Sequence, residues 1–306
     1  MTADELLGRV EAGGLIASPP PLVAMLSGGR DSVCMLDLAV RARGGGEVRA
    51  LHVNYGLRPE ADADEGHCAE LCRRLGVDLR VERPRRPEGA GNLQSWAREQ
   101  RYAAAAGLAE ESGGLIVTGH TADDQVETIL YRLASSPSRR ALLGMRPKDG
   151  RLVRPLLGTS REETTAYCEQ RDLPWRDDPS NEEAGYRRNL LRRDLIPELT
   201  KIHPAARENV LRTAALLREE AELLDSLVDA ELEGGTISQQ RFVGLHPALR
   251  RLVLQRLADE AAGRPVAGAA RFAEQVAGLR RGGSMLDLGG GVRAVVEAGV
   301  LRAERP

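Results

Sequence analysis

The chain has 306 residues, of which 42% are hydrophobic and 29% charged, and its formal net charge is −2 at pH 7. This length exceeds the usual size of a single hydrophobic core, so we expect two domains. Aromatic residues make up only 3% of the chain, which disfavours base recognition by stacked aromatic platforms. Any contact with RNA would therefore rest mainly on arginine.

The composition gives no sign of a membrane segment or a metal-binding cysteine cluster. Apolar runs stay below the roughly 18 residues of a spanning helix, and the N-terminus lacks the basic-then-apolar order of a signal peptide, so we expect a cytoplasmic protein. Cys68 and Cys72 have a spacing that could bind a metal, but no second pair completes a zinc site. We expect all four cysteines to be reduced thiols.

Short apolar strands alternate with amphipathic helices in the first part of the chain. The pattern predicts strands at Leu22 to Leu26, Val48 to Val53, Leu79 to Glu82 and Leu115 to Thr118, with helices at about 31–43, 60–75, 92–110 and 121–134. Strict alternation implies right-handed crossovers and a parallel sheet with helices on both faces. The expected fold class is α/β, with ligands bound beyond the carboxyl ends of the strands.

The pattern changes near residue 200. Helical spacing predicts a long helix at 205–233 and two more at about 246–262 and 267–280, and glycine turns near the C-terminus indicate short strands. We therefore expect an α/β domain at 1–200 and a smaller, mainly helical domain at 201–306 that ends in short strands.

The hexapeptide SGGRDS, Ser27 to Ser32, lies at the first strand-to-helix turn. Two glycines allow a tight turn and close approach to an anion, and the first amides of a helix attract phosphate. The motif lacks the lysine of a Walker loop and has Asp31 instead, which suits a divalent metal between the carboxylate and the phosphates. The alternative is an ordinary turn with a capping residue.

The segment GHTADDQVET follows the fourth strand and enters a helix, at the same sheet edge as SGGRDS. Helical spacing predicts that His120, Asp124 and Glu127 share one face, with Asp123 on the neighbouring face. Acids in a first helical turn also stabilise the helix by about 0.3 to 1 kcal/mol through its dipole. That structural role explains one carboxylate, whereas a histidine with three acids favours a functional site.

Further candidates lie near this edge. Asn54 and Arg58 follow the second strand and are suited to line an adenosine pocket, whereas a lone histidine such as His52 is more often a packed side chain. Arg98 and Arg101, on the helix after residue 92, could reach phosphates or could simply be solvated.

Basic residues cluster in two segments. The seven basic residues of 132–154, set against one acid, are Arg132, Arg139, Arg140, Arg146, Lys148, Arg151 and Arg154, and the string YRRNLLRR at 186–193 has four arginines. Basic patches on a chain near neutrality are typical of a polyanion partner, although arginine-rich solvated surfaces look similar.

Together these strings resemble the tRNA(Ile)-lysidine synthetases, which belong to the N-type ATP pyrophosphatases with a PP-loop. SGGRDSVCMLDL, HVNYGLRPE, NLQSWAREQRY, GHTADDQVETILYRL and the long string from RPLLGTSREE to RRNLLRRDLIPEL occur in family order, over about residues 20–200. Residues 241–304 loosely resemble the small domain that follows in this family. The resemblance therefore implies a catalytic domain at 1–200 and a substrate- or tRNA-binding domain at 201–306.

The resemblance implies an enzyme that adenylates the wobble cytidine of tRNA(Ile) with a CAU anticodon and then joins L-lysine to C2, releasing AMP and diphosphate. The nucleotide-binding candidates are Ser27, Gly28, Gly29, Arg30, Asp31, Ser32, His52, Asn54, Arg98 and Gly119, with Mg²⁺ near Asp31. The catalytic candidates are Asp31, His120, Asp123, Asp124 and Glu127, and the tRNA-binding candidates are Arg139, Arg140, Arg187, Arg188, Asn189, Arg192 and Arg193. No membrane partner is expected, and a homodimer stays open.

Two departures from the family pattern leave alternatives open. Tyr55 replaces the usual histidine, and the segment SSPSRRALLGM, 135–145, replaces a glycine-rich loop. The alternatives are a PP-loop paralogue that joins another amine to tRNA cytidine, a tRNA thiolase, and a non-catalytic RNA- or nucleotide-binding protein. The thiolase would need cysteines to carry sulfur, and the sequence has no C-x-x-C pair.

Overall fold

The computed structural model describes the chain except for residues 18, 58, 88, 90, 136–138, 177–188 and 281–282. The chain forms two compact units, Met1–Ala215 and Leu216–Pro306. The sequence placed the division near residue 200, whereas the units divide within the continuous helix α10 (Ala206–Glu231). The sequence of α10 contains no glycine or proline and no change of composition at residue 215. The position of the division therefore could not be predicted from the sequence pattern.

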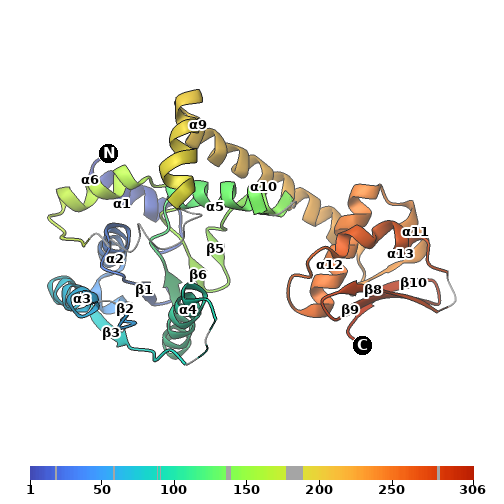
Figure 1. The fold of residues 1–306 in the computed structure, drawn as a ribbon, viewed down its shortest axis with the longest axis horizontal. Helices are drawn as coiled ribbons and strands as arrows, with labels where there is room; N and C mark the ends of the chain where they lie inside the picture. Colours follow the sequence, from blue (N-terminus) through green and yellow to red (C-terminus); the bar gives the residue numbers. More distant parts are fainter. Residues whose placement is uncertain are drawn as a thin grey trace. The chain divides into compact units, whose positions relative to one another are not determined.

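The first unit is built on a six-stranded sheet with the strand order β3-β2-β1-β4-β6-β5 (Figure 1). The parallel strands are β1 (Leu22–Met25), β2 (Val48–Val53), β3 (Asp78–Glu82), β4 (Leu115–Val117) and β6 (Leu152–Val153), and β5 (Lys148–Asp149) pairs antiparallel to β6. The predicted α/β class with a mostly parallel sheet is confirmed. Strands β5 and β6 were not predicted, because two residues are too few to show a periodicity.

Helices connect these strands as expected. The four predicted helices are α2 (Arg30–Arg43), α3 (Ala61–Leu75), α4 (Leu93–Ser112) and α5 (Ala122–Ser135). The sequence missed α1 (Ala3–Ala12), α6 (Arg161–Gln170) and α9 (Ile196–Ile202), together with the short turns η1 (Gly45–Glu47), η2 (Arg139–Leu143) and the π-helical η3 (Leu191–Leu195). Both α1 and α6 begin with a complete capping box, which is the local signal that could have revealed them.

The two faces of the sheet have separate hydrophobic cores. Leu22 and Ala24 of β1 pack in one core with residues of α1, α2, α3 and α6, whereas Val23 packs in a second core with residues of α4. Successive strand residues point to opposite faces, so one short strand anchors both layers. The carboxyl ends of the strands remain as the edge at which loops can form a site.

The second unit has its own core and sheet. The sheet is antiparallel, in the order β7-β10-β9-β8, and consists of β7 (Thr236–Ser238), β8 (Ser284–Gly289), β9 (Val292–Glu297) and β10 (Val300–Glu304). Its helices are α11 (Gln239–Gly244), α12 (Pro247–Ala262), η4 (Ala269–Phe272) and α13 (Ala273–Ala277). Leu254, Leu257 and Val296 belong to the core of this unit.

Gly119 fixes the distance between the loop after β4 and the start of α2. A Cβ atom at Gly119 would lie 2.5 Å from the carbonyl oxygen of Asp31 and 2.7 Å from its carbonyl carbon. Real Cβ atoms do not approach backbone atoms so closely, so only glycine fits without a shift of the helix terminus. The two loops that contain most candidate residues are therefore in direct backbone contact.

Gly119→Ala should therefore destabilise the first unit by about 1 to 3 kcal/mol, the usual range for overpacking. Thermal unfolding measures this effect. The matched control is Gly107→Ala in the middle of α4, where an added Cβ meets nothing within 4 Å. This control should gain about 0.5 to 1 kcal/mol, and equal stability of the two variants would contradict the close contact.

Candidate functional site

The SGGRDS loop is closed by its own serines. The Ser32 hydroxyl donates to the Gly29 carbonyl oxygen at 2.7 Å and accepts from the Ser27 amide at 3.2 Å. Gly28 has φ +85°, and Gly29 is the N-cap of α2 without any side-chain cap. Within the described residues, the amides of Arg30 and Asp31 thus keep their donors for an anion outside the helix, whereas the Ser32 amide donates to the Gly29 carbonyl oxygen at 3.0 Å.

His52 and Asn54 support this loop from within the protein. Both side chains are only 5% exposed. Nδ1 of His52 lies 2.9 Å from the carbonyl oxygen of Leu26, directly before the loop. The Asn54 side chain donates to Asp62 at 3.0 Å and to Glu65 at 2.9 Å. Of these two nucleotide-binding candidates, His52 therefore joins the end of β2 to the start of the loop, whereas Asn54 joins the end of β2 to α3.

Asp31 points toward helix α6. Its Oδ1 accepts from the Thr164 hydroxyl at 2.6 Å and from Nε of Arg30 at 3.1 Å, and its Oδ2 lies 3.9 Å from Nε of Arg161. Thr164 is fully buried. The carboxylate is thus held at a fixed position at the start of α2.

Arg161 connects carboxylates of two helices, α2 and α5. Its guanidinium lies 3.0 Å from Asp124, 3.4 Å from Glu127 and 3.9 Å from Asp31. Its amide donates to Asp123 at 2.9 Å. Burial lowers the pKa of Arg161, but the combined effect of Asp124, Glu127, Asp31 and Asp123 is larger and the net pKa is raised. The side chain therefore stays charged. The sequence analysis missed this residue because it missed α6, whose capping box Ser160–Glu163 places Arg161 at the first helical position.

Two further arginines complete what we call the acid–arginine cluster. Nε of Arg192 donates to Glu127 at 2.8 Å, and Nη1 of Arg207 donates to Asp123 at 3.2 Å. Glu127 is only 4% exposed, so these cations compensate a buried charge. The cluster comprises Asp31, Asp123, Asp124, Glu127, Arg30, Arg161, Arg192 and Arg207.

His120 lies in the turn before α5 and not on the helix itself, which begins at Ala122. The prediction that His120 shares a helical face with Asp124 and Glu127 was therefore wrong, because His120 precedes the helix. The charge of Asp124 still raises the pKa of the His120 ring. Its Nδ1 lies 2.7 Å from the Thr118 hydroxyl. Burial lowers the pKa of His120 to about 4, with Arg154, Arg98 and Arg101 also lowering it. The imidazole is thus neutral at pH 7.

The predicted tRNA-binding arginines are only partly described. Arg187 and Arg188 lie outside the described residues. Arg139 and Arg140 form part of η2, and Asn189 precedes η3, which contains Arg192 and Arg193. Arg192, expected at the tRNA, donates to Glu127 of the cluster. Arg98, expected at the nucleotide, lies over the Tyr102 ring at 4.7 Å from its centroid.

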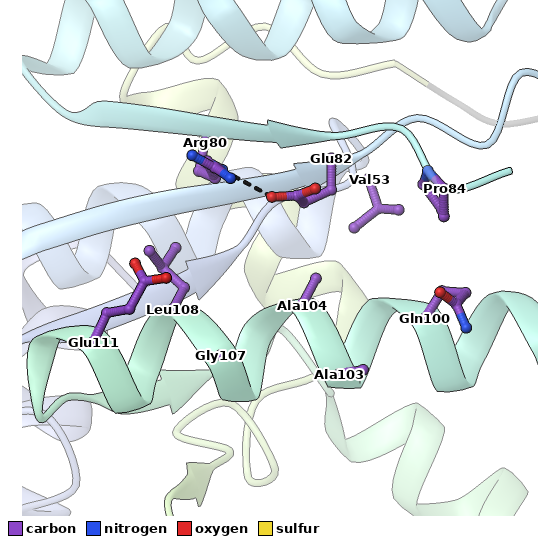
Figure 2. Close-up of a pocket in the computed structure, with 10 residues that line it drawn as sticks. All are labelled: Val53, Arg80, Glu82, Pro84, Gln100, Ala103, Ala104, Gly107, Leu108 and Glu111. Atoms are coloured by element: carbon purple, nitrogen blue, oxygen red, sulfur yellow. Dashed lines mark hydrogen bonds and ion pairs between the residues drawn. The ribbon is translucent and has the colours of Figure 1, made fainter.

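Figure 2 shows a hollow elsewhere in the first unit, between α4 and the strands β2 and β3. Ala103, Ala104 and Gly107 line it from the helix, and Arg80 and Glu82 form a 2.8 Å ion pair on its strand side. Its lining includes none of the predicted site residues. We therefore place the candidate site at the loops, where the fixed charges converge.

A parallel sheet with an uncapped helix N-terminus after its central strand β1 defines an α/β nucleotide-binding domain. A family model described as a PP-loop domain matches residues 16–199. The chain belongs to this PP-loop family.

Curated relatives of the chain are tRNA(Ile)-lysidine synthases. The relative from Pseudomonas aeruginosa is 42% identical over 214 residues, which cover 67% of this chain and 48% of the relative. The relative from Thermus thermophilus is 36% identical over 301 residues, 94% of this chain and 57% of the relative. The chain thus spans about half the length of the curated relatives it matches. The predicted family resemblance is confirmed.

A solved structure shows the same fold. The U34-tRNA thiolase NcsA from Methanococcus maripaludis aligns with a TM-score of 0.60 at 20% identity, over 70% of this chain and 78% of that chain. At this identity the likeness concerns the fold alone. Within the described residues, no helix is both long and apolar enough to cross a membrane.

Arg161→Met should lower the free energy of unfolding by about 1 to 3 kcal/mol, because Glu127 would keep a single cationic partner while it stays buried. Urea denaturation measures this change. The matched control is Arg73→Met, since Arg73 pairs with the exposed Glu70 on α3. Exposed pairs contribute only about 0 to 1 kcal/mol. An equal loss in both variants would contradict a special role for Arg161.

The low pKa of His120 predicts a loss of stability in acid. The unfolded chain binds the proton near pH 6.5 and the folded chain only near pH 4, so this contribution is complete above pH 6.5 and declines as the pH falls toward 4. His120→Gln should therefore lose less stability than the wild type between pH 7.5 and pH 5. Thermal unfolding at the two pH values tests this, and parallel declines would show that His120 does not titrate in this way.

Proposed function

We propose that the chain is an ATP-dependent tRNA-modifying ligase that forms lysidine. ATP would adenylate the O2 of the wobble cytidine of tRNA(Ile) bearing a CAU anticodon, with release of diphosphate. The ε-amine of L-lysine would then attack C2 and displace AMP. The observation that carries this proposal is the similarity to a lysidine synthase across 94% of the chain, with Asp31 and the acid–arginine cluster in place.

The loop supplies the phosphate site of this reaction. The uncapped start of α2 attracts the phosphates of ATP, and the closed Ser27–Ser32 loop holds that helix start at a fixed position. Asp31 is suited to hold a magnesium ion, because Mg²⁺ takes one or two carboxylate ligands and completes its shell with phosphate oxygens and water. Oδ2 of Asp31 is the oxygen that would hold it, since Oδ1 already accepts two hydrogen bonds. Such an ion would neutralise phosphate charge.

The cluster carboxylates are suited to bind the lysine side chain. Asp124 and Glu127 share the Arg161 guanidinium, so an incoming ammonium would compete with this cation for the same oxygens. Attack on C2 requires the amine to lose a proton. A neutral His120 can accept a hydrogen bond in the site, but its pKa of about 4 makes it a weak base. We therefore assign the binding of the ammonium to the carboxylates.

A different amine is the first alternative, because 135–145 departs from the family pattern. In the described part of this segment, the Met145 amide donates to Gln125 Oε1 at 2.7 Å and the Arg132 guanidinium donates to the Gly144 carbonyl at 2.7 Å. Both partners belong to α5, the helix with Asp124 and Glu127. A change in this segment would thus act on the amine site through α5.

The thiolase alternative is disfavoured by the cysteines themselves. All four, Cys34, Cys68, Cys72 and Cys168, are buried. Burial raises the pKa of Cys68 and of Cys72 to about 12, so neither is a thiolate at neutral pH. Sulfur transfer through a persulfide needs a reactive, accessible thiolate, which these residues do not offer.

The decisive measurement is AMP and diphosphate release by purified protein with ATP, Mg²⁺, L-lysine and tRNA(Ile) bearing CAU. Asp31→Ala should lower turnover by at least about a hundredfold, about 2.7 kcal/mol, while the fold is retained. Glu70→Gln is the matched control, since Glu70 pairs with Arg73 on the surface of α3, and its turnover should equal the wild type.

Each other outcome has a clear meaning. Release of AMP that does not require lysine would sink the lysidine proposal, and mass spectrometry of the nucleoside with a panel of amines would then identify the amine that is joined. Binding of ATP and tRNA without any turnover would favour the non-catalytic binding protein.

A further inference from the structure

Three arginines near the candidate site differ from those of the acid–arginine cluster. Every arginine of the cluster has a carboxylate within 4.0 Å. Within the described residues, Arg98, Arg101 and Arg154 have no such partner. Arginine side chains are normally either paired with an acid or exposed to solvent. The burial and the neighbours of these three arginines therefore indicate which ligand they could bind.

The three side chains converge from two elements. Arg98 and Arg101 are three residues apart on α4, and their guanidinium carbons lie 4.7 Å and 5.9 Å from the centroid of the Tyr102 ring. Arg154 follows β6, and its Nη1 donates to the Arg146 carbonyl oxygen at 2.7 Å. Tyr102 and Arg98 are both close enough to alter the pKa of Arg154.

Arg154 is buried, with only 7% of the residue exposed. Its Nε is buried without a hydrogen-bond partner, and so is Nε of Arg101. A buried donor left unpaired costs about 1 to 3 kcal/mol, and more when it is charged. Burial lowers the pKa of Arg154, and the charges of Arg98 and Arg132 lower it further. The chain thus maintains an unfavourable concentration of positive charge next to the neutral His120.

We propose that Arg98, Arg101 and Arg154 form a binding site for a phosphate group, separate from the SGGRDS loop. Planar guanidiniums with free N–H groups match the paired oxygens of phosphate, and several of them together bind its charge more strongly than a single one. The proposal rests on the proposed function, whose two phosphate-bearing substrates are ATP and tRNA. A phosphate in this site would pair the orphaned Nε donors and screen the repulsion among the three cations.

Binding measurements with each substrate alone test this site. ATP and diphosphate are titrated without RNA, and an anticodon stem–loop of tRNA(Ile) is titrated without nucleotide, with wild type, Arg101→Met and Arg154→Met. At least one ligand should lose affinity by about tenfold or more in both variants, which corresponds to about 1.4 kcal/mol. Loss for ATP and diphosphate alone identifies a nucleotide phosphate. Loss for RNA alone, with a salt slope lower by about one, identifies a backbone phosphate.

Arg74→Met is the matched control. Arg74 also donates to a backbone carbonyl, that of Asp172 at 3.3 Å, but it lies in the last turn of α3, away from the three arginines. Its affinities should equal the wild type. Circular dichroism confirms folding, and Arg154→Lys replaces Arg154→Met if the latter does not fold, since lysine keeps the charge but loses the paired geometry.

Unchanged affinity for ATP, diphosphate and RNA in the folded variants would overturn the phosphate site. Because ligand binding is measured and lysine transfer is not, this result is distinguishable from failure of the proposed function. A chain that joins a different amine would still show the predicted loss of phosphate affinity.

Discussion

The Arg161 guanidinium balances the negative charge on which the candidate site depends. Four acids, Asp31, Asp123, Asp124 and Glu127, come from the starts of α2 and α5, and without a cation their mutual repulsion would push the two helices apart. Arg161 reaches three of them with its side chain and the fourth with its amide. A planar, always charged group with several donors suits this task better than lysine. The arrangement also explains why α6 starts where it does, since Asp123 accepts from its first amide.

The sheet determines which residues meet at this point. β1 and β4 are adjacent, so their loops are neighbours, and Gly119 lets them touch through the backbone. The next strand, β6, brings Arg154 to the same edge. The result is two chemically distinct groups of charges, the acid–arginine cluster and the arginines without a carboxylate partner. Both act on the half-buried His120, because Asp124 raises its pKa while Arg154, Arg98 and Arg101 lower it.

Long periodic segments made the α/β fold predictable from the sequence. The loops after β1 and β4 could be selected as candidate sites because ligands of parallel sheets bind beyond the carboxyl ends of the strands. His52 and Asn54 were harder, because a polar residue at a strand end can face a ligand or a neighbouring loop, and only packing decides between them. Arg161 was missed for a different reason. Its partners on α5 are 34 to 38 residues away along the chain and Asp31 is farther, and no local pattern encodes contacts at such separation. Two-residue strands such as β6 leave no pattern either, which hid Arg154 among the surface arginines.

The pairing of charges within the cluster affects how one ligand changes the affinity for another. Four acids and four arginines compensate one another, so the cluster by itself offers little net field to an incoming cation. A polyphosphate bound at the start of α2 would add negative charge beside Asp31 and so make the same place attractive to an ammonium group. In the proposed reaction the nucleotide and the amine should therefore increase each other's affinity, by the same factor because of thermodynamic reciprocity. Calorimetric titration of one in the presence of the other measures that factor.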